Sequence, residues 1–142
     1  MLNTMVLNQE ILIDAPAEKI WQVLTDPVLV KQYLYGTTMT VEPRIGGTIR
    51  FTGAWEGKEY VDKGTVLGYV TNEHFAYSYH SSFSPLPDLP ENYAAVAFTI
   101  VPQSSGCLLQ LEQRGFPDEA AYAHSLENWR SIMLEMKKLA EG

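Results

Sequence analysis

The chain has few of the residues that form disulfides, thiolate metal clusters or surfaces for nucleic acid. Cys107 is the only cysteine, which excludes an internal disulfide and a cluster of thiolate ligands. Basic residues are scarce as well, because 10 Lys and Arg stand against 17 Asp and Glu, for a net charge of -7. Phosphate backbones and anionic membrane surfaces repel such a chain, so we expect no nucleic-acid partner.

Long apolar runs are also missing. No run approaches the roughly 20 apolar residues that span a bilayer, so we expect no membrane span. The N-terminal sequence MLNTMVLNQE lacks the basic segment and the apolar segment of a secretory signal, so we expect a cytoplasmic protein. A length of 142 residues with 46% hydrophobic and 19% charged residues is typical of a globular chain, and we expect one domain over residues 1–142.

The clearest pattern lies near the end of the chain, from about residue 118 to 141. Apolar side chains recur there in steps of three and four, as on one face of a helix: Tyr122, Leu126, Trp129, Met133, Met136 and Ala140, widened by Ile132 and Leu139. The side expected to face water carries Glu119, Ser125, Asn128, Glu135 and Lys138. Ordering a helix of this length costs more than burial of the apolar stripe supplies, so the helix needs a partner surface.

The rest of the chain predicts strands and two short helices. Residues 5–14 alternate apolar and polar side chains as a half-buried strand does. Pro16 suits the first position of a helix, and Asp26 followed by Pro27 repeats the start signal. Residues 38–114 consist of segments with alternating apolar and polar side chains, separated by turn residues, and predict about six antiparallel strands. A proline-rich loop at residues 82–92 interrupts them and is long enough to cover a neighbouring part of the molecule.

This order of elements predicts an α+β fold. An antiparallel sheet commonly buries one face, and the only long element available to cover that face is the C-terminal helix. We therefore expect a curved antiparallel sheet wrapped around the long C-terminal helix, with two short helices after the first strand.

Several motifs resemble those of the SRPBCC superfamily, also called START-like, and the branch of the activator of heat-shock-protein-90 ATPase homologues is the most similar. The motifs are the run Ile13-Asp14-Ala15-Pro16-Ala17-Glu18-Lys19-Ile20-Trp21, then Leu24-Thr25-Asp26-Pro27, Gly46-Gly47 with Phe51, Gly64-Thr65-Val66, and Gly115-Phe116 ahead of Asn128-Trp129. The resemblance implies a helix-grip fold over a single START-like domain, with a deep, largely apolar cavity between sheet and long helix. Gln113 stands where many relatives have a histidine, so a role for that histidine is not carried over.

Signals for metal binding, nucleophilic catalysis and nucleotide binding are weak. His74, His80 and His124 lack paired spacing and lie on separate predicted elements, so we expect surface or hydrogen-bonded histidines and no metal site. Cys107 is expected to be a small packing residue. Gly46-Gly47 lacks the further glycines and the following helix of a phosphate loop, and we expect no cofactor.

The candidate ligand-binding residues are mainly aromatic side chains expected on the inner face of the sheet or on the apolar stripe of the helix. They are Tyr33, Phe51, Trp55, Tyr60, Tyr77, Tyr79, Phe98, Leu111, Gln113, Trp129, Met133 and Met136. Tyrosines beside a cavity can point a hydroxyl at a ligand, although cores and pockets use the same side chains. Gln113 shares a face with Leu109 and Leu111 and needs a buried partner, while Asp62 and Arg50 are weaker polar candidates.

Three functions remain open from the sequence. The first is a binding module that holds a hydrophobic or aromatic small molecule between sheet and helix. The second is a cyclase-like or hydrolase-like enzyme in which Gln113, Asp62 or a cavity tyrosine acts as acid or base. The third, a co-chaperone type of interaction domain, is disfavoured because we expect no room for the additional binding domain of the eukaryotic activators. A homodimer is left open.

Overall fold

The computed structural model describes residues 4–142, so residues 1–3 of the expected domain 1–142 lie outside the described residues. Its elements follow the predicted order of one strand, two short helices, six strands and one long helix. Their bounds are β1 (Val6–Ile13), α1 (Ala17–Thr25), α2 (Pro27–Tyr33), β2 (Thr38–Val41), β3 (Thr48–Trp55), β4 (Lys58–Val70), β5 (His74–Tyr79), β6 (Ala94–Pro102), β7 (Cys107–Arg114) and α3 (Glu119–Glu141). A short 3-10 turn, Pro90–Asn92, lies in the proline-rich loop.

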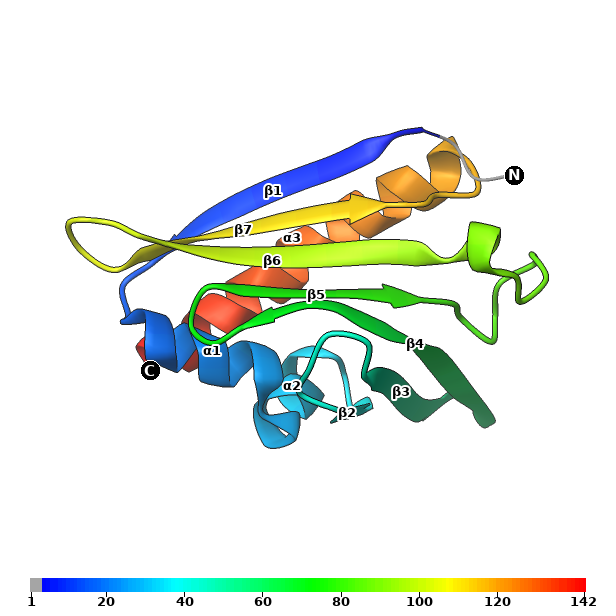
Figure 1. Cartoon of the computed structure of the whole chain (residues 1–142), viewed down its shortest axis with the longest axis horizontal. Helices are drawn as coiled ribbons and strands as arrows, with labels where there is room; N and C mark the ends of the chain where they lie inside the picture. Colours follow the sequence, from blue (N-terminus) through cyan, green and yellow to red (C-terminus); the bar gives the residue numbers. More distant parts are fainter. Residues whose placement is uncertain (1–3) are drawn as a thin grey trace.

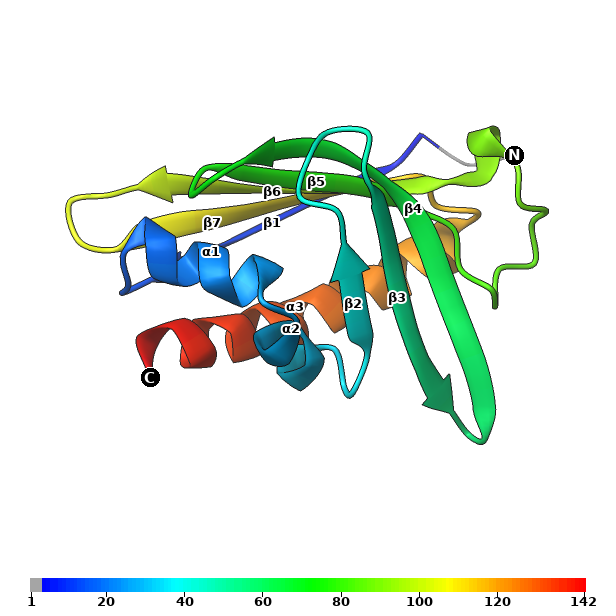
Figure 2. The same cartoon turned by 60° about the horizontal axis from the view of Figure 1, so that its bottom comes forward.

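The seven strands form one antiparallel sheet in the order β1-β7-β6-β5-β4-β3-β2. Helix α3 runs along one face of the sheet, with α1 and α2 beside its C-terminal half (Figure 1). Figure 2 shows β3 and β4 curving away from β5 and passing the N-terminal half of α3. The predicted α+β fold, a curved antiparallel sheet around a long C-terminal helix, is therefore confirmed.

The helix ends have the local chemistry that the sequence signals predict. The Asp26 side chain caps α2 by accepting a hydrogen bond from the Val28 backbone amide at 2.9 Å. Asp118 caps α3 in the same way, through the Ala121 amide at 2.8 Å. Pro16 is the N-cap of α1 rather than its first helical residue, and its φ of -71° is one that the proline ring itself imposes.

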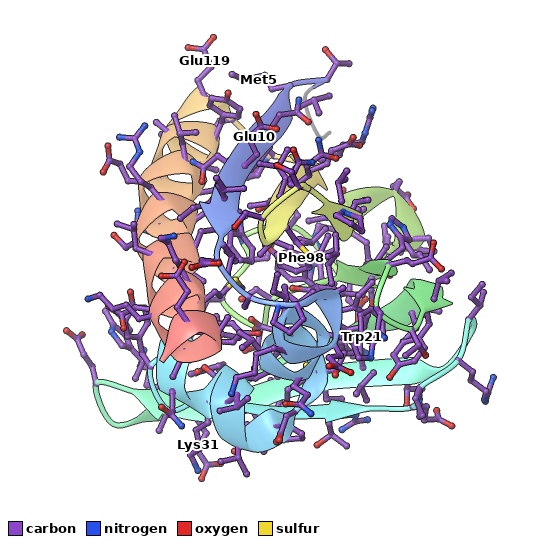
Figure 3. The ribbon with its side chains drawn as sticks, turned by 90° about the vertical axis from the view of Figure 1, so that its left-hand side faces the viewer. Met5, Glu10, Trp21, Lys31, Phe98 and Glu119 are labelled. Carbon is purple, nitrogen blue, oxygen red and sulfur yellow. The ribbon has the colours of Figure 1, made fainter. Side chains whose placement is uncertain are left out.

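The core lies between the sheet and the C-terminal half of α3. Of the predicted helical stripe, Ile132, Met133, Met136 and Ala140 are buried, whereas Trp129 and the residues before it are half-buried. Figure 3 shows Phe98 inside this layer of side chains, and it shows Lys31 and Glu119 at its outside. Leu139 is half-buried as well, so burial of the stripe is greater, but not complete, in the C-terminal half of α3.

Side chains also tie α3 to the outer strand β1. The Gln9 side-chain amide donates a hydrogen bond to the Leu126 carbonyl at 2.8 Å. Near the other end of α3, the Lys137 ammonium donates to the Leu12 carbonyl, also at 2.8 Å. These two contacts fix the helix along the full length of the strand.

The curvature of the sheet depends on a close approach at Gly64. Strand β4 pairs with β3 up to Thr65 and with β5 from Val66 onward, and the pairing has an irregularity just beyond, between Val66 and Gly68. A Cβ atom at Gly64 would lie 1.7 Å from the backbone oxygen of Ser78, so only glycine lets the two backbones approach this closely.

We expect Gly64→Ala to lower the free energy of unfolding by about 1 to 3 kcal/mol, because the backbone of β5 must move to admit the methyl group. Urea denaturation measures the change. Thr65→Ala is the matched control: its side chain is exposed, so its effect should stay within about 0.5 kcal/mol. Equal effects of the two substitutions would contradict the close approach.

Candidate functional site

A pocket of about 480 Å³ opens between the N-terminal half of α3 and the inner face of β3, β4 and β5. This volume is in the range of small-molecule sites. The pocket is lined by Leu34, Tyr35, Thr37, Phe51, Ala54, Trp55, Tyr60, Asp62, Tyr77, Tyr79, Phe83, Gln113, His124, Ser125, Asn128, Trp129 and Ile132.

Seven of the twelve candidate residues from the sequence lie on this wall: Phe51, Trp55, Tyr60, Tyr77, Tyr79, Gln113 and Trp129. The other five, Tyr33, Phe98, Leu111, Met133 and Met136, are not among the lining residues and are buried in the core. Met133 and Met136 lie beyond Trp129 toward the C-terminal end of α3, which α1 and α2 cover. Phe98 packs against the Trp129 ring with a centroid distance of 5.7 Å.

Other lining residues were not candidates from the sequence. Ser125 and Asn128 were expected on the water-facing side of the helix. Asn128 is exposed and Ser125 is half-buried, and both also line the pocket, because the β3–β4 hairpin passes beside that part of α3. Helical periodicity identifies only the face with the most apolar side chains, so it gives no signal for this second surface. Phe83 comes from the proline-rich loop, where the length of the loop was the only available signal.

Aromatic rings form much of the wall opposite α3. The centroids of Phe51 and Tyr77 are 5.2 Å apart, and those of Tyr60 and Phe83 are 5.7 Å apart. Trp55 lies 6.4 Å from Phe83 and is 62% exposed, which places it at the mouth of the pocket. These rings offer a ligand apolar surface both at the mouth of the pocket and next to the core.

The loop that carries Phe83 is held in place by polar contacts at its far end. The Tyr93 hydroxyl donates a hydrogen bond to Oδ1 of Asp88 at 2.6 Å. The Lys63 ammonium of β4 forms an ion pair with Oδ2 of the same carboxylate at 2.8 Å. Both contacts are near the surface, so they position the loop rather than stabilise the fold by much.

Gln113 joins the two sides of the pocket. The Trp129 indole Nε1 donates a hydrogen bond to Oε1 of Gln113 at 2.5 Å, and Nε2 of Gln113 donates to the Tyr79 hydroxyl at 3.2 Å. Because an indole N–H can only donate, it fixes which end of the amide faces α3. The buried amide predicted from the alternation of β7 thus has a partner at each end.

Asp62 is the acidic side chain of the pocket wall. It lies on β4 directly opposite Phe51 of β3. Its Oδ1 atom is buried and has no hydrogen-bond partner among residues 4–142. Burial raises the pKa of this carboxyl, and hydrogen bonds to it from the Ser81 side chain and the Ser82 backbone, together with the nearby His80, offset only part of the rise.

The tyrosines deep in the pocket are held in the neutral form. Burial, and then the charge of Asp62, raise the pKa of Tyr79 to about 12, against a smaller opposing effect of the hydrogen bond from Gln113. Burial also raises the pKa of Tyr77 well above its usual range. Neither phenol can therefore act as a base near neutral pH, although each can donate a hydrogen bond.

The histidines have separate environments. His74 Nδ1 shares a hydrogen bond with the Thr99 hydroxyl at 3.1 Å, and Nε2 of His80 donates to the Leu86 carbonyl at 3.1 Å. His124 is exposed at the edge of the pocket. No group of three or more His, Cys, Asp or Glu suited to a metal ion occurs in the part of the chain that the structure describes.

Comparison with known proteins adds a family and a set of similar structures. Residues 14–141 match the model of the family described as Activator of Hsp90 ATPase homolog 1-like protein. The solution structure of ChR145 from Cytophaga hutchinsonii is 34% identical, with a TM-score of 0.83 over 97% of this chain and 94% of that one. MLL2253 from Mesorhizobium loti is 25% identical, with a TM-score of 0.79 over 95% and 96% of the two chains.

The Aha1 dimer from Colwellia psychrerythraea shares the fold at 19% identity, with a TM-score of 0.74 over 96% of each chain. No curated protein matches the chain. Within residues 4–142, no helix combines the length and apolar character needed to cross a bilayer. The family match and the shared fold support a domain of the ligand-binding type.

Replacing Gln113 by Leu should lower the free energy of unfolding by about 1 to 3 kcal/mol, because the Trp129 indole and the Tyr79 hydroxyl would both lose a buried partner. Thermal and urea unfolding measure the loss. Gln110→Leu is the matched control on the exposed side of the same strand, and we expect it to change stability by about 0.5 kcal/mol or less. A Gln113 variant as stable as the Gln110 variant would show that the amide does not hold the pocket together.

Asp62 should make stability depend on pH in a defined direction. Its pKa is higher in the folded than in the unfolded chain, so the folded state binds more protons between the two values. The free energy of unfolding therefore falls as pH rises above about 4, the usual pKa of Asp, and through the folded pKa. Asp62→Asn removes this fall, so the variant should gain stability relative to the wild type as pH rises toward 7.

Urea denaturation at a series of pH values measures this trend, and Asp88→Asn is the control of opposite sign. Hydrogen bonds from Lys63 and Tyr93 lower the pKa of Asp88. Its contribution to stability is therefore present above the unfolded pKa and is lost as pH falls through the folded pKa. The free energy of unfolding of the wild type, relative to that of the Asp88→Asn variant, should accordingly increase as pH rises. Parallel pH trends for the two variants would refute the assignment for Asp62.

Proposed function

This chain belongs to the Activator of Hsp90 ATPase homolog 1-like family, as its resemblance to this branch of the SRPBCC superfamily predicted, and on that premise we propose that it is a binding protein for a hydrophobic or aromatic small molecule. The ligand would lie between α3 and the inner face of β3, β4 and β5. The observation that carries the proposal is the aromatic pocket of about 480 Å³.

The chemistry of the wall supports binding over catalysis. Gln113 has both ends of its amide engaged by protein partners, and the Tyr77 and Tyr79 phenols stay protonated near neutral pH. Of the acids and bases considered from the sequence, these contribute hydrogen bonds or shape rather than proton transfer. The pocket is thus organised to hold and orient a molecule.

Asp62 favours an enzyme as the second candidate. A desolvated carboxyl with a raised pKa keeps its proton to a higher pH than an ordinary Asp and can serve as a proton donor or acceptor. In that case Asp62 would be the acid or base of a cyclase-like or hydrolase-like reaction, and Asp62→Asn would abolish turnover while leaving ligand binding measurable. Turnover that survives this substitution would exclude the role.

Location and assembly are further parts of the proposal. The single cysteine fits a reducing compartment and so supports a cytoplasmic location. The Aha1 of Colwellia psychrerythraea is a dimer, which supports testing for a homodimer by native mass spectrometry. The same measurement on gently purified protein would detect a small molecule that co-purifies.

The binding proposal is tested by filling the pocket from the helix. N-phenyl-1-naphthylamine, an uncharged probe that fluoresces in apolar surroundings, should bind the wild type with increased emission. Ser125→Trp should weaken that binding by about tenfold or more, because Ser125 lines the pocket and an indole ring would occupy much of its volume. The affinity comes from the titration of probe emission.

Ser131→Trp is the matched control, since Ser131 is exposed on the same helix and is not a lining residue. It should bind the probe as the wild type does. Circular dichroism checks that both variants unfold like the wild type. Equal binding by both variants, or no binding by the wild type, would overturn the proposal.

A further inference from the structure

The pocket presents one buried acceptor that the described residues leave unsatisfied. Oδ1 of Asp62 has no partner among residues 4–142. Neighbouring polar groups are paired with one another: Gln113 bridges Trp129 and Tyr79, and the Tyr60 hydroxyl is hydrogen-bonded to Thr37. A buried polar atom normally has a partner, and Asp62 lines the pocket, so its incompletely satisfied carboxylate is a place for a hydrogen-bond donor on a ligand.

The charge around this position favours a cation. Among the lining residues none is Lys or Arg, and the exposed His124 is the one basic side chain. His80 is near Asp62 but is not a lining residue, and its ring is hydrogen-bonded to the Leu86 carbonyl. A ligand carboxylate or phosphate would therefore meet the Asp62 carboxylate with no Lys or Arg on the wall, whereas a ligand cation would compensate the burial of that carboxylate. The net charge of -7 attracts cations from a distance as well.

Aromatic residues are close to Asp62 on the neighbouring strands. Phe51 is directly opposite Asp62 on the neighbouring strand, and Tyr60 precedes it by two residues and therefore lies on the same face of β4. The Tyr77 ring is 5.2 Å from Phe51. Faces of aromatic rings attract organic cations, and the attraction is larger where water is excluded.

We infer that the ligand of this pocket is an organic amine with an aromatic or apolar body, whose ammonium group donates a hydrogen bond to the Asp62 carboxylate. The body packs against the rings of Phe51, Tyr60 and Tyr77. This inference rests on the proposed binding function and narrows its ligand class. A neutral hydroxyl would supply the hydrogen bond without compensating the charge, and a carboxylic acid would supply neither at neutral pH.

Three probes of similar shape test the inference: 1-naphthylmethylamine, 1-naphthalenemethanol and 1-naphthoic acid. Each is titrated against wild-type protein loaded with N-phenyl-1-naphthylamine, and the loss of emission gives its affinity. The amine should displace the reporter at a concentration about tenfold or more below that of the alcohol, since a hydrogen bond between charged groups exceeds a neutral one by this factor or more, and the acid should be weakest. Measurements in 1 M salt, where surface charges are screened within about 3 Å, isolate the contribution of the pocket.

Asp62→Asn should weaken binding of the amine about tenfold and leave the alcohol nearly unchanged. Glu59→Gln is the matched control, an exposed acid on the same strand that does not line the pocket, and it should keep the wild-type order of the three probes. If Asp62→Asn does not fold, the order of the probes on the wild type still decides the question.

The outcomes separate the two proposals. If the reporter does not bind the wild type, the binding function itself fails. If the reporter binds and the three probes displace it equally, or none displaces it, the amine assignment fails while the binding function stands. An alcohol as tight as the amine would mean that the position accepts a neutral donor, which overturns the choice of a cation.

Discussion

Covering the apolar side of α3 is the constraint on which the rest of the structure depends. The sheet must curve to wrap the helix, and it curves where β4 passes from β3 to β5 at the close approach of Gly64. At the C-terminal half of α3, the short helices and the sheet close completely over Met133 and Met136. At the N-terminal half, the β3–β4 hairpin covers the helix only in part. The uncovered space between hairpin and helix is the pocket.

The polar groups of the pocket differ in how completely the protein satisfies them. Gln113 is enclosed and spans the gap between Tyr79 on the sheet and Trp129 on the helix, so it contributes to the fold as much as to the wall. Asp62 has the opposite character, because the strand pairing places its carboxylate among aromatic rings and leaves one oxygen without a protein partner. The amide of Gln113 has a protein partner at each end and is a structural group, whereas the incompletely paired acid Asp62 is the group available to a ligand.

Most of the fold, but only part of the pocket, could be predicted from the sequence. Periodicity of two and of 3.6 residues reports burial against the nearest layer, which is why the strands, the stripe of α3 and the inward position of Gln113 were predictable. The same signal cannot tell a core residue from a wall residue, so Tyr33, Phe98, Leu111, Met133 and Met136 were grouped with residues that line the pocket. Ser125 and Asn128 were assigned to the water-facing side because their role depends on a contact between segments far apart in the chain.

The bonds between α3 and β1 have a consequence for aggregation. Strand β1 is at one end of the sheet, and the side chains of Gln9 and Lys137 cross between this outer strand and the helix. The opposite outer strand, β2, is only four residues long. Short or covered outer strands offer little template for pairing between molecules. If α3 detached, the apolar face and the unpaired backbone of β1 would become accessible together, so the helix that shapes the pocket also keeps the sheet from adding strands of other chains.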